Sequence, residues 1–384
     1  MTPTPISPNI GMPPLQIQRQ RGVGTDLVLL DRAPLRELHL TLTPGRTEGV
    51  DSLIERLAQL LHQHQAVVVR HLVFGPVAAH AETLRAMQRQ FGDVDWPVTW
   101  MEGNKETGNT IAGMQIHTLA GAQVKTLVHH DRIVGRTFND GEATHCVLGD
   151  IGPTQTTIAA PEQARETFEN LEAALGLAGM SLKNVARTWL FLDEILSWYG
   201  PLNQVRNDYF ARHELRPGAF PASTGVAGKN PRGAAMVAAA WAVAPHHATA
   251  GVHFVGSPKQ GAAPAYGSAF SRAVEIFSSN TRQILVSGTA SIAPEGQTVH
   301  VDDTARQIEL TMEVVGAILE ARDMSFADTT RAVAYFKSPT NVPLFAAWRR
   351  RNGQQAMPVT HVCCDICRAD LLFELELDAV RAVS

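Results

Sequence analysis

The sequence predicts an α+β fold made of two fused copies of one domain, each a mixed sheet with helices on one face. Three observations predict it: a long internal repeat, the order of strand-like and helix-like segments inside each copy, and the composition. The chain has 384 residues, of which 45% are hydrophobic and 18% are charged. These values are ordinary for a globular protein with a substantial buried core.

The internal repeat relates two stretches of 30 residues without a gap. Residues 163–192 (QARETFENLEAALGLAGMSLKNVARTWLFL) match residues 307–336 (QIELTMEVVGAILEARDMSFADTTRAVAYF) at a constant offset of 144, since 307 − 163 = 144. Gln163 matches Gln307 and Arg187 matches Arg331 in this register. A fixed long period of this kind indicates a duplicated domain rather than a short solenoid repeat.

Each copy has the same expected order of elements. An apolar strand comes first, and a helix follows, with apolar residues at i, i+3, i+4 and i+7. A short loop, a second strand, a second helix and a last strand complete the copy. The expected elements are, in pairs, residues 145–151 and 283–292, the helices beginning near 163 and 307, the strands 186–192 and 330–336, the helices around 202–213 and 342–351, and the strands 234–244 and 371–380.

The domain limits follow from this order and from loop composition. Residues 1–20 are rich in proline and predict a flexible tail. Residues 111–246 and 251–384 are the two expected domains, and the Gly-, Ala- and Pro-rich stretch 245–264 lies between them. Residues 21–110 contain helix-like and strand-like segments, and the sequence leaves open whether they form a degenerate third unit or an N-terminal elaboration.

Charge and cysteine usage exclude several classes of function. The formal net charge is −4 and no basic run dominates, so nucleic acid is not expected as a partner. No apolar stretch of 20 residues predicts a membrane span, and the N-terminus lacks the pattern of a signal peptide. The four cysteines do not form a disulfide framework, which favours reduced thiols in a cytoplasmic protein.

The stretch HVCCDICRADLLFELELDAV, residues 361–380, raises three hypotheses. His361 and the three cysteines offer zinc ligands, but no second ligand pair completes the set, so no metal and no other cofactor are expected. A plain core strand with solvated glutamates is the second hypothesis. In the third, Glu374 lies among apolar side chains, where burial would raise its pKa and keep it protonated as a general acid.

The strand-turn ILVSGTASI, Gln307 in the following helix and the late LLFELELDAV resemble the Rid family. That resemblance implies small domains of the chorismate-mutase-like fold, which assemble as trimers with active clefts between neighbours. It covers the chain from about Cys146 to the C-terminus, in two copies.

A more specific resemblance is to the chorismatases, which have two fused Rid-like units and cleave the enol-pyruvyl ether of chorismate. The matching stretches are ARTWLFLDEI, PASTGVAG, SPKQGAAPAYGSAFSRAV, LVSGTASI and CRADLLFELE. The resemblance implies that Glu374 is the catalytic acid and that Cys367 takes the place of a cysteine of hydroxybenzoate-forming members. It also implies that Arg272 and Arg212 hold substrate carboxylates.

Further substrate-binding candidates follow from the expected dicarboxylate. Arg206 could supply another cation, Tyr266 could hydrogen-bond a carboxylate, and the Gly-rich turn at Ser287 and Gly288 could offer backbone N–H groups. The sequence departs from the chorismatase pattern in the N-terminal region and at Leu190 and Ala211, where asparagine and glycine are usual.

The expected function is therefore a cofactor-independent, chorismatase-like hydrolase or lyase that gives a hydroxybenzoate-like acid and pyruvate. One alternative is a Rid-type enamine or imine deaminase, although Val359 and Ala222 stand where such enzymes carry an arginine after proline. Another is a non-catalytic protein that binds a small-molecule carboxylate in a biosynthetic pathway. The chain would act as a monomeric pseudo-trimer if its N-terminal region supplies a third unit, and as a homo-oligomer such as a trimer if it does not.

Overall fold

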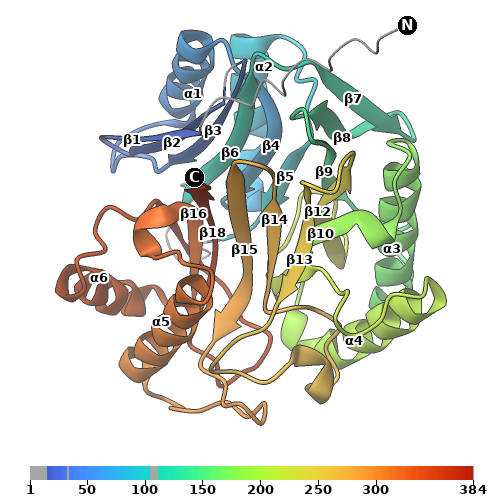
Figure 1. The fold of residues 1–384 in the computed structure, drawn as a ribbon, viewed down its shortest axis with the longest axis vertical. Coiled ribbons are helices and arrows are strands. Elements are labelled where there is room, and N and C mark those ends of the chain that lie inside the picture. Colours follow the sequence, from blue (N-terminus) through green and yellow to red (C-terminus); the bar gives the residue numbers. More distant parts are fainter. Residues whose placement is uncertain (1–14, 33, 104–110, 384) are drawn as a thin grey trace, which may run out of the picture.

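The computed structural model describes residues 15–32, 34–103 and 111–383. The described chain forms three six-stranded mixed sheets, which meet in the middle of the molecule. Two helices accompany each sheet, and Figure 1 shows the three helix pairs on the outside of the molecule. The expected α+β class, with helices on one face of each mixed sheet, is confirmed.

The first unit contains eight helices and strands of the described chain. They are β1 (Gln16–Gly22), β2 (Thr25–Arg32), β3 (Leu35–Leu42), α1 (Val50–His64), β4 (Val67–Phe74), α2 (His80–Phe91), β5 (Val98–Met101) and β6 (Gly113–Ala120). Residues 1–14 of the expected tail lie outside the described residues. Residues 16–20 are not part of a tail, because β1 pairs along its whole length with β2.

The second and third units repeat this series of elements. The second unit has β7 (Val124–His129), β8 (Arg132–Asn139), β9 (Ala143–Ile151), α3 (Ala160–Gly176), β10 (Val185–Leu192), α4 (Ile195–Arg212), β11 (Ala222–Ala227) and β12 (Met236–Pro245). The third has β13 (Gly251–Val255), β14 (Ala273–Phe277), β15 (Thr281–Ala290), α5 (Thr304–Glu320), β16 (Thr329–Phe336), α6 (Val342–Arg351), β17 (Val359–Cys363) and β18 (Phe373–Ala382).

All three sheets have one strand order. The orders are β1-β2-β3-β6-β4-β5, β7-β8-β9-β12-β10-β11 and β13-β14-β15-β18-β16-β17. The N-terminal region is therefore a third unit of the same topology. Its last strand, β6, lies beyond the expected limit at residue 110 but pairs with β3 and β4, so the first sheet ends at Ala120.

The two glutamines of the sequence repeat have the same structural role. The side-chain amide of Gln163 donates to Ile158 O at 2.8 Å, and its carbonyl oxygen accepts from Ala235 N at 2.8 Å. Gln307 likewise donates to Asp370 O at 2.9 Å and accepts from Leu372 N at 2.8 Å. Each glutamine thus ties the start of a helix to the segment before the last strand of its unit.

The hydrophobic core has separate outer parts and a shared centre. One buried cluster lies between helices and sheet in each unit, and another joins inward-facing residues of all three sheets. None of the helices within the described ranges is both long and apolar enough to cross a membrane.

Three equivalent arginines lie at the centre of the molecule. Arg70, Arg187 and Arg331 each follow an irregularity in the fourth strand of a unit, where a residue of that strand is skipped in the pairing. All three are buried and pack on the Trp189 ring at 4.7–5.5 Å. Glu376 forms ion pairs with Arg187 at 2.7 Å and with Arg331, whereas Arg70 pairs with Asp378 at 3.7 Å.

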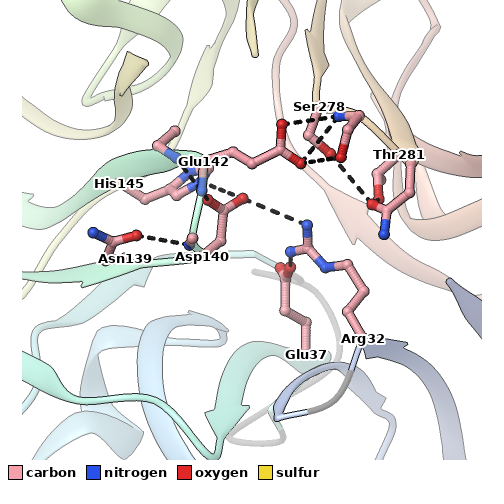
Figure 2. A network of polar contacts seen from close by, with 12 residues as sticks. Arg32, Glu37, Asn139, Asp140, Glu142, His145, Ser278 and Thr281 are labelled. Atoms are coloured by element: carbon pink, nitrogen blue, oxygen red, sulfur yellow. Dashed lines mark hydrogen bonds and ion pairs between the residues drawn. The ribbon is translucent and has the colours of Figure 1, made fainter. Parts of the chain in front are cut away.

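A polar network also joins the units near one end of the sheets (Figure 2). Arg32 of the first unit pairs with Asp140 of the second at 3.4 Å. Glu142 of the second unit accepts a hydrogen bond at 3.0 Å from the backbone N–H of Ser279 in the third. These contacts fix how the units sit against one another.

Candidate active site

Glu374 is the second residue of β18 and lies where the second and third units meet. In the sheet it pairs with Ala290 of β15 and Tyr335 of β16. The residue is 4% exposed, and it lines a small cleft of about 40 Å³ that also includes residues of β11 and α4. Both faces of β18 are covered from Phe373 to Val380, so this glutamate is buried, and the hypothesis of a solvated surface residue is wrong.

A bulge in β15 creates the space for the Glu374 carboxyl. The pairing of β15 with β18 shifts between Val286 and Thr289, so Ser287 and Gly288 bulge out of the ladder. A Cβ atom on Gly288 would overlap Oε1 of Glu374. Gly288 thus lies directly against the carboxyl. Its N–H donates to Thr224 Oγ1 at 3.0 Å and does not point into the cleft.

Ser287 connects two units instead of facing a ligand. Its hydroxyl accepts from the backbone N–H of Ser223 at 2.9 Å and donates to Ser271 O at 2.6 Å. The side chain is fully buried and does not line the cleft. Its role is therefore to hold β11 of the second unit against the third.

Burial makes Glu374 a neutral acid at physiological pH. Desolvation, followed by the nearby negative charge of Glu376, raises its pKa to about 8, and Arg187 opposes part of the shift. A carboxyl group with this pKa is mostly protonated at pH 7 and can donate a proton.

Cys367 lies in the same cleft, at the end of the segment before β18. Burial, and then the neighbouring Glu374, raise the pKa of its thiol to about 12. The group is therefore a neutral thiol near pH 7, and it is not a thiolate nucleophile.

Three arginines also line the cleft. Arg272 is 3% exposed and donates through Nε and Nη2 to Gly261 O, at 3.0 and 2.8 Å. Arg206 is equally buried and donates to Asn203 Oδ1 at 2.6 Å. Arg368, the third of these cations, stacks with Arg272 on the ring of Tyr266, at 5.7 and 5.5 Å.

Arg212 lies outside the cleft, so the expectation that it helps to bind substrate there has to be corrected. It is exposed at the end of α4, and its guanidinium packs on Tyr209 at 5.5 Å. Arg206 and Arg212 are six residues apart on one helix, which places their side chains about 120° apart around the axis. Only one of them can face the cleft.

The sequence did not single out Tyr199, although it lines the cleft. Its hydroxyl hydrogen-bonds Ser268 and contacts Cys367 and Arg206. The residue follows a kink at Trp198, whose φ/ψ are not helical, and Pro201 lies inside the same helix. The proline was the available signal that α4 is not a regular helix at this point.

The other clefts of the molecule lack this acid. Arg331, Arg187 and Arg70 pair with Asp378, Trp241 and His117, respectively. Four residues earlier, the last strands of the three units carry Glu374, Val237 and Gly113. Only the third unit therefore presents a carboxyl at this position.

A larger hollow of about 470 Å³ also lies between the units, but its charges do not suit an anion. It is lined by four acidic and two basic residues: Glu102, Asp193, Glu194, Asp365, Lys229 and Lys337. In the smaller cleft Glu374 is the single acidic residue among the described lining residues, and three arginines line the same cleft. The smaller cleft is therefore the better site for a carboxylate.

Similar proteins were found both by sequence and by structure. No protein-family model matches the chain. A 3-hydroxybenzoate synthase from Streptomyces hygroscopicus is 27% identical over 277 residues, which is 64% of this chain and 77% of that protein.

A chorismatase crystal structure superposes with a TM-score of 0.59 at 17% identity, covering 81% of this chain and 92% of that one. This likeness shows the fold. The resemblance to tandem Rid-like proteins of the chorismatase branch is thus confirmed, and the chain has the chorismatase fold.

Proposed function

We propose that this protein cleaves the enol-pyruvyl ether of chorismate and releases pyruvate and 3-hydroxybenzoate. One observation supports the proposal: a buried carboxyl group with a pKa of about 8 and three arginines line one cleft. The cleft thus joins a proton donor to a wall that attracts anions. The 27% identity to a 3-hydroxybenzoate synthase supports the same reaction.

Glu374 is the proton donor in this reaction. Its proton is transferred to the methylene carbon of the enol ether, which turns the ether carbon into an oxocarbenium ion. Water or the ring hydroxyl of the substrate then traps this cation, and the pyruvyl group leaves as pyruvate. The atoms of chorismate equal those of 3-hydroxybenzoate plus pyruvate, so any water taken up in the first step is released on aromatisation.

The three arginines bind the two carboxylates of the substrate. Guanidinium groups bind carboxylates through paired hydrogen bonds, and they remain charged at any physiological pH. Because Glu374 is neutral, the wall of Arg206, Arg272 and Arg368 is not compensated by an acid within the cleft. A dianion supplies the missing negative charge.

Cys367 favours the aromatic product in this proposal. Its thiol interacts electrostatically with Glu374 and stays protonated. It can therefore donate a hydrogen bond to the reacting ring or accept one from it. Its place in the sequence is that of the cysteine expected in hydroxybenzoate-forming chorismatases.

The experiment is to incubate the purified protein with chorismate, to measure pyruvate with lactate dehydrogenase and to separate the ring products by chromatography. We expect equimolar pyruvate and 3-hydroxybenzoate. If the products were pyruvate and a dihydroxycyclohexadiene acid, the assignment of the site would stand and the assignment of the aromatic product would be wrong. Hydrolysis of 2-aminoacrylate without turnover of chorismate would favour the deaminase alternative, and inactivity on both would contradict an enzymatic role.

A further inference from the structure

A cluster of three potential metal ligands lies on the inner face of the first sheet. Glu37 and His39 are two residues apart on β3, and His117 pairs directly with His39 on the neighbouring strand β6. Side chains at i and i+2 of a strand share a face with the residue directly across, so these three converge. Their ligand atoms lie within 4.8 Å of one another, and all three residues are buried.

The two histidines have ring nitrogens without a hydrogen-bond partner. Among residues 15–32, 34–103 and 111–383, neither Nδ1 nor Nε2 of His39 has a partner, and Nδ1 of His117 has none either. His39 is 2% exposed and His117 is not exposed at all, so solvent does not satisfy these atoms. Buried polar groups are normally paired, so unpaired nitrogens on neighbouring buried rings suggest a missing partner.

The residue types of the cluster also suit a transition metal. Two imidazoles and a carboxylate form a ligand set typical of zinc and related transition metals.

We propose that Glu37, His39 and His117 bind a divalent transition-metal ion, with zinc as the best match, as a structural site of the first unit. Oε2 of Glu37 already lies 3.1 Å from Nε2 of His117, and an ion between them would replace that contact. The two rings are stacked, with centroids 4.6 Å apart, and turn about their side-chain bonds to point at one ion. Zinc holds such ligands at about 2.0–2.2 Å, so the three atoms draw closer when the ion binds.

Arg32 holds the carboxylate in place for this ion. Its Nη2 pairs with Oε1 of Glu37, and its Nη1 pairs with Asp140 (Figure 2). Oε2 is therefore left for the ion, and the hydrogen-bonded Oε1 is the outer support that metal-ligating carboxylates commonly have. Since Asp140 belongs to the second unit, the ion would stabilise the contact between these units.

The first experiment measures metal content. The protein is expressed in zinc-supplemented medium, so that the buried site fills during folding, and is purified without an immobilised-metal column. We expect one zinc per chain in the wild type, and zinc at background level in His39→Gln and His117→Gln. His71→Gln is the matched control, because His71 is buried on β4 of the same sheet but outside the cluster, and it should keep the metal.

The outcomes separate this cluster from surface histidines. The pairs His129–His130 and His246–His247 could bind metal on the surface. Zinc retained in the His39 and His117 variants would place it there and overturn the proposal. A wild-type protein that carries no zinc above the His39→Gln level would overturn it as well.

A second experiment uses the wild type alone and does not depend on folding of a variant. Protein expressed with cobalt should show the intense visible bands of four-coordinate Co²⁺ without a thiolate-to-cobalt charge-transfer band. A thiolate band would assign the ion to cysteines, and the weak spectrum of six-coordinate cobalt would assign it to an open surface site. Either spectrum would contradict the proposal.

Discussion

Two clefts share the same backbone arrangement but differ in their side chains. One lies between the second and third units, and its counterpart lies between the first and second units. In the former, the N–H of Gly288 donates to Thr224 Oγ1 at 3.0 Å; in the latter, the N–H of Asp150 donates to Thr99 Oγ1 at 2.9 Å. Val237 stands where the former has Glu374. The fold thus supplies equivalent clefts, and two substitutions decide which of them can hold an acid.

The residue at the bulge shows how the clefts diverged. Gly288 leaves room for the carboxyl of Glu374, whereas Asp150 adopts a φ of 51° and fills the equivalent space with a carboxylate that pairs with Arg132. In the cleft between the third and first units, Gly113 lies against the side chain of Thr360. Neither counterpart combines a free carboxyl with a cationic wall.

Removing the acid should have the largest effect. Glu374→Gln keeps the shape of the side chain and cannot donate an acidic proton, so we expect pyruvate release to fall about 10²–10⁴-fold. Asp150→Asn, the matched change in the counterpart cleft, should leave the rate unchanged. Equal losses in the two variants would mean that the clefts do not differ as described.

Replacing Gly288, which lies against the Glu374 carboxyl, should lower the catalytic rate nearly as much. In Gly288→Ala the new methyl group overlaps the Glu374 carboxyl, and displacing it by about 1 Å costs about 10²-fold in rate. Gly176→Ala is the control, because a Cβ there meets no other atom within 4 Å. A Gly288→Ala enzyme with wild-type activity would show that the carboxyl does not act from this position.

The cationic wall should affect substrate binding. Each hydrogen bond to a charged group contributes about 1.5–3 kcal/mol, so Arg272→Ala should lower kcat/KM about 10–100-fold, with kcat less affected. Arg212→Ala removes an exposed arginine of α4 and should change neither constant. Steady-state kinetics with chorismate would contradict the assignment if Arg212→Ala were the more impaired variant.

The pH dependence follows from the raised pKa of Glu374. Its protonated form is the active one, so kcat should be level below pH 8 and fall about tenfold per pH unit well above it. The free energy of unfolding should also decrease with rising pH. The unfolded chain releases this proton near pH 4.5 and the folded chain near pH 8, so the folded state loses stability as the pH rises between these values. Urea unfolding at several pH values should show this decrease in the free energy of unfolding for the wild type, and a smaller decrease for Glu374→Gln.

Changing the thiol should have the smallest effect on rate. Cys367→Ala keeps the acid and the arginines, so pyruvate release should continue while the ring product shifts from 3-hydroxybenzoate toward the dihydroxycyclohexadiene acid. Product analysis by chromatography checks this expectation. An unchanged product ratio would remove Cys367 from the account.

The repeat made the second and third units predictable from sequence, because Gln163 and Gln307 recur at a fixed spacing and accept equivalent hydrogen bonds, from the backbone N–H of Ala235 and of Leu372. The first unit shares the topology without this register, so its equivalence is seen in the strand order and in the pairing of Arg70 beside the bulge. Strands such as β13, whose residues are largely exposed, lack the alternation that signals a strand.

The candidate site was predictable where a residue has a local pattern or a family motif. Glu374 was predictable from the family motif, whereas the alternation of its strand was also compatible with a solvated face; the residue is buried because both faces of β18 are covered. Predicting which of Arg206 and Arg212 lines the cleft requires knowing how α4 is rotated about its axis. Predicting the position of Tyr199 requires knowing that the helix is kinked at Trp198. Contacts between units, such as that of Thr224 with Gly288, join segments 64 residues apart and have no local signature.

The protonation state of Glu374 tests the central claim most directly. Infrared difference spectra of the wild type minus Glu374→Gln, recorded across a pH series, isolate the absorption of this one carboxyl group. The account predicts a protonated carboxyl band at pH 7 that disappears with a midpoint near pH 8. A carboxylate band already present at pH 6 would contradict a buried neutral acid and the chemistry built on it.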